Sequence, residues 1–291
     1  MKGLILVNAY TRSEHELYQP RRIREELAEM GAEADIRRND FVPAYLDGDV
    51  KPCVQGYDFG VYLDKDKYAS RLLERAGMRL FNRAEAVETC DDKMRTHIAL
   101  AGVAEMPATI PAPLSYTPSA PVSETLLDRV EETLGYPVVV KECYGSLGKG
   151  VYLAEDRTQL RAYAEKLKAK PHLFQKFVAE SAGKDLRVLV VGGRAVAAMR
   201  RVAENDFRSN AELGGRGEQY PLDTVSAAYC EKIAGALGLD FCGIDLLFGR
   251  DGYKVCEVNS NAFFGTFERV TGVNVARLYA AHILHNMQKN R

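Results

Sequence analysis

The chain has 291 residues, 46% hydrophobic and 27% charged, a composition typical of a globular protein and not of a disordered one. Its 39 basic and 40 acidic residues leave a formal net charge of −1, which argues against a chain-wide basic surface for nucleic acid. No run of about 18 apolar residues occurs, and Leu4 to Val7 is too short for a signal-peptide core, so neither a membrane span nor secretion is expected. The six cysteines are scattered without a CxxC pair, which argues against a zinc site or disulfide framework and favours the cytoplasm.

The first 90 residues predict a small α/β domain. Short apolar runs typical of buried strands alternate with segments of helical spacing, and this rhythm favours a parallel sheet covered by helices. The expected strands are 3–7, 35–38 and 57–63, and the expected helices are 15–30 and 67–76.

The middle of the chain begins with a helix to about residue 101, capped by Asp91 or Asp92. Five prolines between residues 107 and 121 then predict a connector. The elements expected after it are a helix over 123–134, strands over 136–142 and 150–154, and a helix over 157–168.

The last third predicts two β-hairpins and two helices. Gly192-Gly193 separates strands 186–191 and 194–202, and Arg250-Asp251-Gly252 separates strands 241–248 and 253–258. The expected helices are 226–237 and 275–288.

A glycine-rich loop connects two of the expected strands in VVVKECYGSLGKGVYLA. A strand follows the loop, so neither the dinucleotide-binding GxGxxG fingerprint nor the P-loop fits, and a nucleotide-dependent dehydrogenase is disfavoured. Glycines allow backbone N–H groups to approach phosphates, and Lys141 would add a point charge. The alternative is a plain hairpin loop with a surface lysine.

Two carboxylates interrupt the apolar strands of the last hairpin in GIDLLFGRDGYKVCEVNSN. A turn at residues 250–252 brings Asp245 nearly opposite Glu257, and strand alternation puts Asn259 on the same face as Glu257. Such an oxygen-only set suits magnesium that carries nucleotide phosphates. The alternative is that one carboxylate faces solvent at a sheet edge.

Arginines mark the stretch from residue 184 to 216. Arg187 and Arg200 are embedded in strands, and Arg208 opens the polar loop Arg208-Ser209-Asn210, so these side chains suit carboxylates or phosphates. Arg194 and Arg201 fit a solvated basic face. Other candidates are weaker. The pair His282 and His285 lacks a third metal ligand, so a solvated helix face is favoured, and Cys143 lacks a partner base, so a packing role is favoured for it. Phe263, Phe264 and Phe267 fit either a pocket lining or core.

In this order, the Lys–Gly hairpin, the Arg/Asn loop and the Asp…Glu-x-Asn hairpin resemble the ATP-grasp superfamily. The segments GKDLRVLVVGGRAVAAMRR, DFRSNAELGG and EVNSN…ERVTGVNVA resemble its RimK-type glutamate ligases and related amino-acid ligases, over roughly residues 80 to 285. The resemblance implies an α/β (α+β) fold in three parts: an N-terminal parallel-sheet α/β domain (1–90), a central ATP-grasp part (91–178) and a C-terminal antiparallel-sheet part (179–291). ATP would lie between the last two parts.

The resemblance also implies roles for individual residues. ATP would be bound by phosphate contacts from Lys93 and Lys141, by a lid, by an adenine hinge and by Asp185 at the ribose. The lid residues are Gly145, Ser146, Gly148 and Gly150, and the hinge residues are Gln175, Lys176, Phe177 and Val178. Magnesium or manganese would be held by Asp245, Glu257 and Asn259. The groups facing the acyl phosphate or the substrates would be Arg200, Arg208 and Asn210, with Lys141 also assisting catalysis.

The implied activity is an ATP-dependent carboxylate–amine ligase that forms an amide through an acyl phosphate. The partners are ATP, a carboxylate and an amine such as an amino acid, peptide or protein tail, with glutamate as the family's amine; neither membrane nor nucleic acid is expected, and a homo-oligomer is left open. Two departures bear on this: Lys176 stands where the hinge commonly carries Glu, and Asn261 to Phe264 replace a Ser-Pro-Gly type turn. The alternative is an ATP-binding regulatory module that has lost ligase activity.

Overall fold

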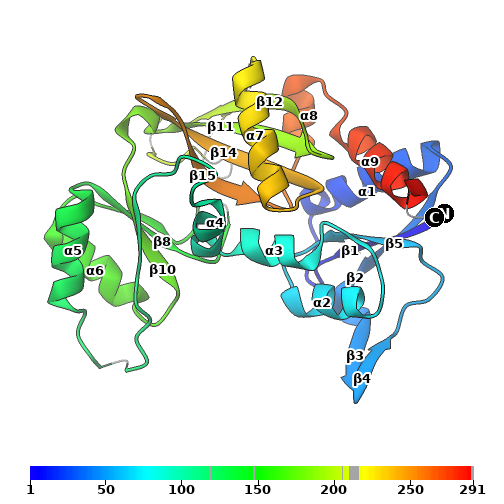
Figure 1. Ribbon diagram of the computed structural model, residues 1–291, viewed down its shortest axis with the longest axis horizontal. Coiled ribbons are helices and arrows are strands. Elements are labelled where there is room, and N and C mark those ends of the chain that lie inside the picture. Colours follow the sequence, from blue (N-terminus) through cyan, green and yellow to red (C-terminus); the bar gives the residue numbers. More distant parts are fainter. Residues whose placement is uncertain (118, 147, 205, 210–215, 290–291) are drawn as a thin grey trace.

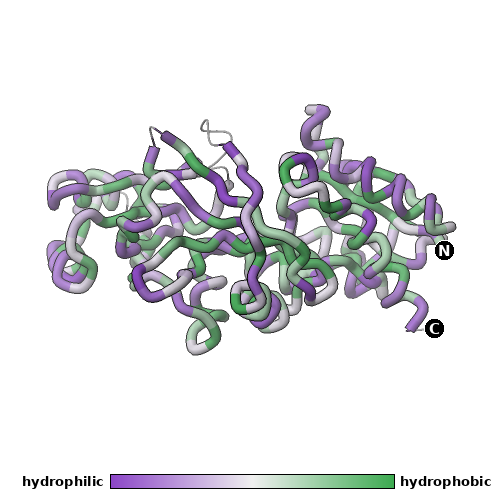
Figure 2. Tube along the Cα trace, turned by 90° about the horizontal axis from the view of Figure 1, so that it is seen from above, coloured by the Kyte–Doolittle hydropathy of each residue, from purple (hydrophilic) through white to green (hydrophobic). Residues whose placement is uncertain are grey.

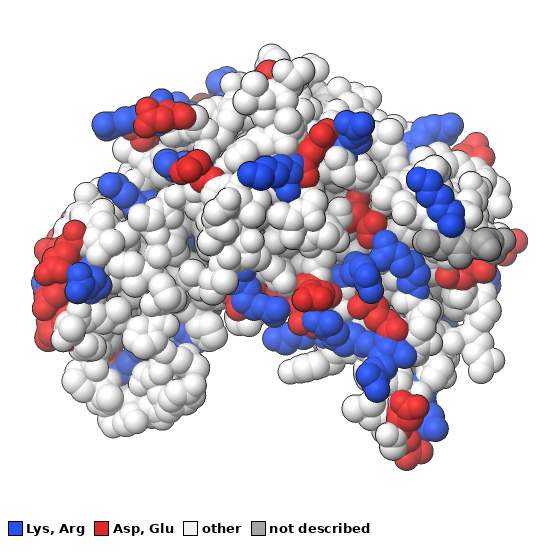
Figure 3. Space-filling model, in the orientation of Figure 1, with Lys and Arg blue, Asp and Glu red and all other residues white. Residues whose placement is uncertain are grey.

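The computed structural model describes residues 1–117, 119–146, 148–204, 206–209 and 216–289, and the statements below concern these residues. Three sheets organise the molecule, which is elongated, with both termini at the same end (Figures 1 and 2). No helix in this described part is both long and apolar enough to cross a membrane. Basic and acidic side chains lie side by side in several places on the face shown in Figure 3, in keeping with a net charge of −1.

The N-terminal sheet is parallel, as the sequence predicts. Its strand order is β2-β1-β5-β6, so the chain runs outward from β1 to β2 and then returns past β1 to β5. A small hairpin, β3–β4, projects from this part of the molecule (Figure 1) and was not predicted. The strands are β1 (Lys2–Val7), β2 (Glu33–Arg38), β3 (Ala44–Asp47), β4 (Asp49–Pro52), β5 (Phe59–Leu63) and β6 (Leu80–Phe81), and the helices are α1 (Glu14–Glu29), η1 (Asn39–Phe41) and α2 (Lys67–Arg75).

Two short helices lead out of the N-terminal sheet, α3 (Ala84–Asp91) and α4 (Lys93–Leu100). The second begins where the sequence predicts, because the carboxylate of Asp92 accepts hydrogen bonds from the backbone N–H groups of Met94 and Arg95. The first was missed, and it packs against α2 and the edge of the C-terminal sheet.

The central sheet is antiparallel in the order β7-β10-β8-β9, and α5 and α6 cover it at the left of Figure 1. Its buried side chains form a separate apolar core, which includes Leu127, Val140 and Phe174. The elements are β7 (Thr109–Pro111), α5 (Glu124–Leu134), β8 (Val138–Glu142), β9 (Val151–Ala154), α6 (Arg157–Leu167) and β10 (His172–Lys176).

The C-terminal sheet is antiparallel in the order β13-β12-β11-β14-β15, and both predicted hairpins are present. Residues Leu189, Met199 and Phe241 from this sheet share one core with Ile5 and Val61 of the N-terminal sheet, so these two sheets form a continuous body. The elements are η2 (Ala179–Ser181), β11 (Lys184–Val191), β12 (Arg194–Val202), β13 (Arg216–Tyr220), α7 (Thr224–Ala236), β14 (Phe241–Gly249), β15 (Gly252–Asn259), α8 (Gly265–Thr271) and α9 (Val275–Lys289).

Two β-bulges decide which side chains face the neighbouring sheets. Near the turn, β11 and β12 pair as Val190 with Ala195, but beyond a register shift Asp185 pairs with Arg201. In the second hairpin the register shifts between Asp245 and Leu246, so Asp245 pairs with Glu257. Because one extra residue moves all later side chains to the other face, the bulges bring Asp185, Arg201, Asp245 and Glu257 onto one face.

Candidate functional site

A first cavity lies between the central and C-terminal sheets. Its walls come from α4, the β8–β9 loop, β10 and the segment after it, and strands β11, β12, β14 and β15. The sequence-predicted residues that line it are Lys93, Lys141, Gly145, Ser146, Gly148, Gln175, Lys176, Phe177, Val178, Asp185, Arg208, Asp245 and Glu257. Motifs that lie far apart in the sequence, from Lys93 to Glu257, therefore line one cavity.

Lys141 on β8 is a buried cation without a buried counter-charge. It is 7% exposed, and its Nζ donates to Gln175 Oε1 at 2.7 Å and lies 3.6 Å from Cys256 Sγ. Burial raises the pKa of the Cys256 thiol, so its sulfur is a neutral neighbour. Among the described residues no carboxylate forms an ion pair with Lys141, and a buried ammonium in a cavity favours an anionic ligand such as phosphate.

Lys93, the first residue of α4, reaches the same cavity. It is 8% exposed, and its Nζ donates to Gly145 O at 2.9 Å and lies 3.6 Å from Glu257 Oε1. It therefore contacts both the glycine-rich loop and the carboxylate on β15. Two buried lysines and one partly exposed carboxylate line the same cavity, and such a set can accommodate phosphates together with a cation.

The glycine-rich loop is a hairpin connection, as predicted, since Lys141 pairs with Val151 across β8 and β9. Gly145, Gly148 and Gly150 have φ values of 126°, 72° and 71°, which only glycine adopts without strain. Of these, Gly150 does not itself line the first cavity. The guanidinium of Arg208 donates to Gly148 O at 2.8 Å and so connects the 206–209 segment to the loop.

Asp245 and Glu257 face each other across β14 and β15, as the sequence predicts, and Asn259 lies one strand repeat further, opposite Gly243. Asp245 is 3% exposed. Both of its oxygens accept hydrogen bonds from Arg187 at 2.7 Å, and Arg201 approaches Oδ2 at 2.8 Å. Burial alone raises the pKa of Asp245, but the two guanidinium groups outweigh burial and hold the pKa below its usual value.

Arg201, and not the predicted Arg200, lines the first cavity. Arg201 is 6% exposed, donates to both oxygens of Asp185 at 2.7 and 2.5 Å and lines the cavity. Arg200 points to the other face of β12 and donates to Glu218 at 3.0 and 2.5 Å. The cause is the bulge in β12, because an unbulged two-residue hairpin pairs Asp185 with Arg200.

A second cavity of about 340 Å³ adjoins the first. It lies where the carboxyl ends of β1 and β5 meet α1, the loop after β15 and the C-terminal sheet. Ser146, Arg201 and Glu257 line both cavities, so one group of residues separates the two spaces. Of the two cavities, Arg187, Asn259 and Phe263 line the second and not the first, whereas Phe264 and Phe267 are core residues.

The side chains of Asp245, Glu257 and Asn259 are chemically suited to bind a divalent cation, because all three offer hard oxygen donors on one face of adjacent strands. Within the described ranges no three His, Cys, Asp or Glu side chains form a ready metal cluster. Since the oxygens of Asp245 are engaged by arginines, metal binding there requires at least one arginine contact to give way.

The hinge residues follow the end of β10. Gln175 is buried at 1% exposure, and its side chain holds Lys141 while donating to Thr109 and His97, so it positions a lysine. Burial lowers the pKa of His97 to about 4, which keeps the ring neutral. Lys176, Phe177 and Val178 line the cavity beside it. Asn210 lies outside the described residues.

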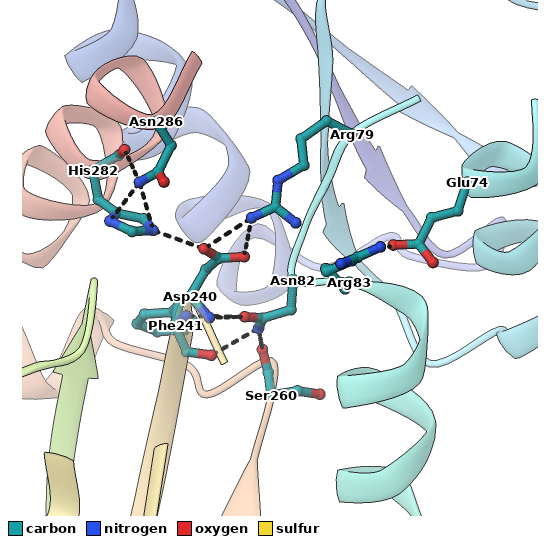
Figure 4. Close-up of polar contacts among 9 residues, drawn as sticks. All are labelled: Glu74, Arg79, Asn82, Arg83, Asp240, Phe241, Ser260, His282 and Asn286. Carbon is teal, nitrogen blue, oxygen red and sulfur yellow. Dashed lines mark hydrogen bonds and ion pairs between the residues drawn. The ribbon is translucent and has the colours of Figure 1, made fainter. Parts of the chain in front are cut away.

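A polar hub anchors the second cavity to the N-terminal sheet (Figure 4). The buried Asn82 side chain donates to Phe241 O and Ser260 O at 2.7 Å and accepts from Asp240 N and Phe241 N. Ser260 directly follows Asn259, so Asn82 fixes the end of β15. His282, expected on a solvated helix face, instead bonds Asp240 at 2.8 Å.

Among the residues of the site that the sequence did not single out are Arg201 and Cys256 in the first cavity and Asn8 and Asp64 in the second. A signal for Asp64 was available, since it follows a predicted strand of a parallel sheet, and ligands bind at the carboxyl ends of such strands. Cys143, which the sequence assigned to packing, is buried at 3% exposure, and burial raises its pKa to about 11.

Comparison with known proteins agrees with this geometry. Residues 90–283 match the model of the RimK-like ATP-grasp domain, so the site and the fold define an ATP-grasp protein. The chain belongs to the RimK-like ATP-grasp family.

Particular relatives illustrate this membership. The probable alpha-L-glutamate ligase of Psychromonas ingrahamii is 33% identical over 290 residues, covering 94% of this chain and 93% of that protein. Human N-acetylaspartylglutamate synthase A is 38% identical over 237 residues, covering 79% of this chain and 59% of that protein. A RimK-domain ATP-grasp protein of Sphaerobacter thermophilus has the same fold, with a TM-score of 0.75, 22% identity and coverage of 97% and 99% of the two chains. This chain spans somewhat more than half the length of several curated relatives, 55% and 59% in two cases.

Proposed function

We propose that this protein is an ATP-dependent carboxylate–amine ligase that forms an amide bond through an acyl phosphate. The observation that carries the proposal is the contact between two cavities at Arg201, Glu257 and Ser146. One cavity holds the buried cation Lys141 and suits a nucleotide, and the other is polar and suits organic substrates. Related proteins named as glutamate ligase and N-acetylaspartylglutamate synthase support glutamate as one substrate.

In this proposal the nucleotide occupies the first cavity. Lys93 and Lys141 would neutralise the phosphate charge, Arg208 and the glycine-rich loop would close over it, and Asp185 would accept from the ribose. Residues 175 to 178 would border the adenine. The departure at Lys176 is compatible with this role, since its backbone N–H already donates to Ala108 O and its side chain is exposed.

The carboxylate substrate would meet the terminal phosphate where the two cavities join. Arg201 would stabilise negative charge on the acyl phosphate and on the tetrahedral intermediate formed when the amine attacks, and Arg187 would orient the carboxylate. A magnesium ion, when bound by Asp245, Glu257 and Asn259, supplies charge neutralisation on the phosphates. The carboxylate oxygen would bond to the terminal phosphorus as ADP leaves. The neutral amine would then form the C–N bond and lose one proton to solvent, while the C–O bond to phosphate breaks and inorganic phosphate leaves.

The proposal also includes the domain division and the cellular compartment of the protein. We propose a division of the chain at residues 90 and 178, which is supported by strands β6, β7, β10 and β11, since β6 ends and β7 begins on either side of the first bound and β10 ends and β11 begins on either side of the second. The described cysteines are all free thiols, which supports a reducing cytoplasm as the compartment.

The test is a screen for ADP release from magnesium–ATP with pairs of carboxylic acids and amines, including glutamate as the amine. Lys141→Ala and Glu257→Gln should abolish substrate-dependent ADP release while the fold survives. Lys51→Ala and Glu29→Gln change exposed residues outside both cavities and should behave as wild type. Wild-type turnover in either site variant would overturn the proposal, and ATP binding without any turnover would favour a module that has lost ligase activity.

A further inference from the structure

Three polar side chains meet at one edge of the N-terminal sheet. Asn8, Asn39 and Asp64 follow the carboxyl ends of β1, β2 and β5 respectively. Because the chain reverses its direction across the sheet between β1 and β5, Asn8 and Asp64 stand at the topological switch point, where α/β sheets bind ligands. Both residues line the second cavity.

Asp64 is a buried carboxylate served only by neutral donors. It is 8% exposed, and it accepts from Lys65 N and Asn39 Nδ2 at 2.7 Å and from Asn8 Nδ2 at 3.2 Å to both oxygens. Three neutral groups make four hydrogen bonds to this carboxylate, two on each oxygen, and none of them brings a positive charge. The carboxylate also lines the second cavity, so a ligand in that space can reach its negative charge.

No cation of the described chain neutralises this carboxylate. The nearest lysine in sequence, Lys65, turns its Nζ to Asp91 at 3.1 Å, and none of the ion pairs found among described residues includes Asp64. Burial raises the pKa of Asp64, in keeping with a charge that has lost its hydration without gaining a counter-ion. A cationic ligand would supply the positive charge that the described residues do not place beside Asp64.

The remaining charges of the second cavity divide it into two ends. Arg187, Arg201 and Glu257 stand on the C-terminal sheet, next to the first cavity, whereas Asp64 and Lys65 stand at the edge of the N-terminal sheet. The other carboxylate on the N-terminal side, Glu16, is already engaged, because its Oε2 accepts from Ser13 and from Arg12 N in the cap of α1. Glu16 is also exposed to solvent, so Asp64 is the buried one of these two acids.

We propose that Asp64, supported by Asn8 and Asn39, is the binding site for an ammonium group of the amine substrate. The substrate class is a primary amine that enters as its cation, with the carboxylate substrate held at the arginine end of the same cavity. This inference rests on the proposed ligase function for its biological meaning, but the binding itself requires neither ATP nor turnover.

The experiment measures binding of three matched probes to the full chain by saturation-transfer difference NMR: n-butylammonium, 1-butanol and butyrate. Wild type should bind butylammonium more tightly than butanol. Asp64→Asn should weaken butylammonium binding at least about tenfold, as expected for loss of a hydrogen bond to a charged group, and leave butanol unchanged. Asp40→Asn, an exposed carboxylate of the same domain that lines neither cavity, should bind as wild type does.

The outcomes separate this inference from the proposed function. Lys141→Ala should abolish ADP release and still bind butylammonium, so failure of the ligase assay does not decide the ammonium site. Equal affinity of wild type and Asp64→Asn for butylammonium, or an equal loss in Asp40→Asn, would overturn the inference. If Asp64→Asn does not fold, Asp64→Ser removes the same charge and leaves room for a water to accept from the three donors, and the same comparison applies.

Discussion

Replacing Arg201 and its neighbour Arg200 by methionine should have very different consequences, although the two arginines are adjacent on β12. Arg201 is 6% exposed and donates to Asp185 at 2.7 and 2.5 Å. In Arg201→Met, Asp245 keeps its two hydrogen bonds from Arg187, but Asp185, itself 6% exposed, loses its cation. Breaking a buried pair in this way costs about 3–5 kcal/mol.

Arg200→Met removes an ion pair whose side chains are 43% and 30% exposed, and Glu218 keeps a second partner in Arg216. Such surface pairs contribute about 0–1 kcal/mol. Denaturation in guanidinium chloride, followed by circular dichroism, compares the two variants, and Arg201→Met with Asp185→Asn should recover part of the loss. Fluorescent ATP analogues should bind normally to Arg200→Met and more weakly to Arg201→Met. Equal destabilisation by the two substitutions would refute the assignment of faces.

Two further predictions concern groups that support the cavities. The pKa of His97 falls from 6.5 to about 4 on folding, so the unfolded state binds more protons between these values. The unfolding free energy should therefore decrease by about 3 kcal/mol as pH falls from 6.5 to 4. His97→Gln should flatten this part of a plot of unfolding free energy against pH, and an unchanged slope would contradict the buried neutral ring. Asn82→Ala removes four hydrogen bonds at a buried position and should lower the unfolding free energy by about 3 kcal/mol. Asn82→Asp should lower it at least as much, because the new carboxylate faces two carbonyl oxygens. Denaturation midpoints within error of wild type would show that these hydrogen bonds do not stabilise the fold.

The sequence predicted most of the architecture because the relevant signals are local. Gly192-Gly193 and the turn at residues 250–252 set two hairpins, alternating βα segments set a parallel sheet, and Asp92 set the start of α4. The β3–β4 hairpin and α3 were missed, since their stability comes from packing and not from a strong local pattern.

The choice between Arg200 and Arg201 shows where sequence reasoning ends. A two-residue turn at Gly192-Gly193 without a bulge places Arg200 opposite Asp185. The register shift between Leu189 and Val190 instead brings Arg201 opposite Asp185, and no residue type in β12 marks that shift. In the second hairpin the bulge helps the prediction, because it moves Glu257 opposite Asp245.

Asp64 shows a different limit. Its position after a strand was predictable, but its significance depends on Asn8 and Asn39, which are 56 and 25 residues away in the chain. Only the assembled sheet reveals that all its donors are neutral and that the nearby lysine pairs elsewhere.

The most direct test of the account follows oxygen atoms through the reaction. A carboxylic acid that supports ADP release is labelled with ¹⁸O in its carboxylate and incubated with magnesium–ATP, the amine and the protein, and the released phosphate is analysed by mass spectrometry. An acyl phosphate predicts ADP and phosphate that carries one ¹⁸O atom for each amide formed, with no product from Glu257→Gln. AMP and pyrophosphate, or phosphate without label, would contradict the account.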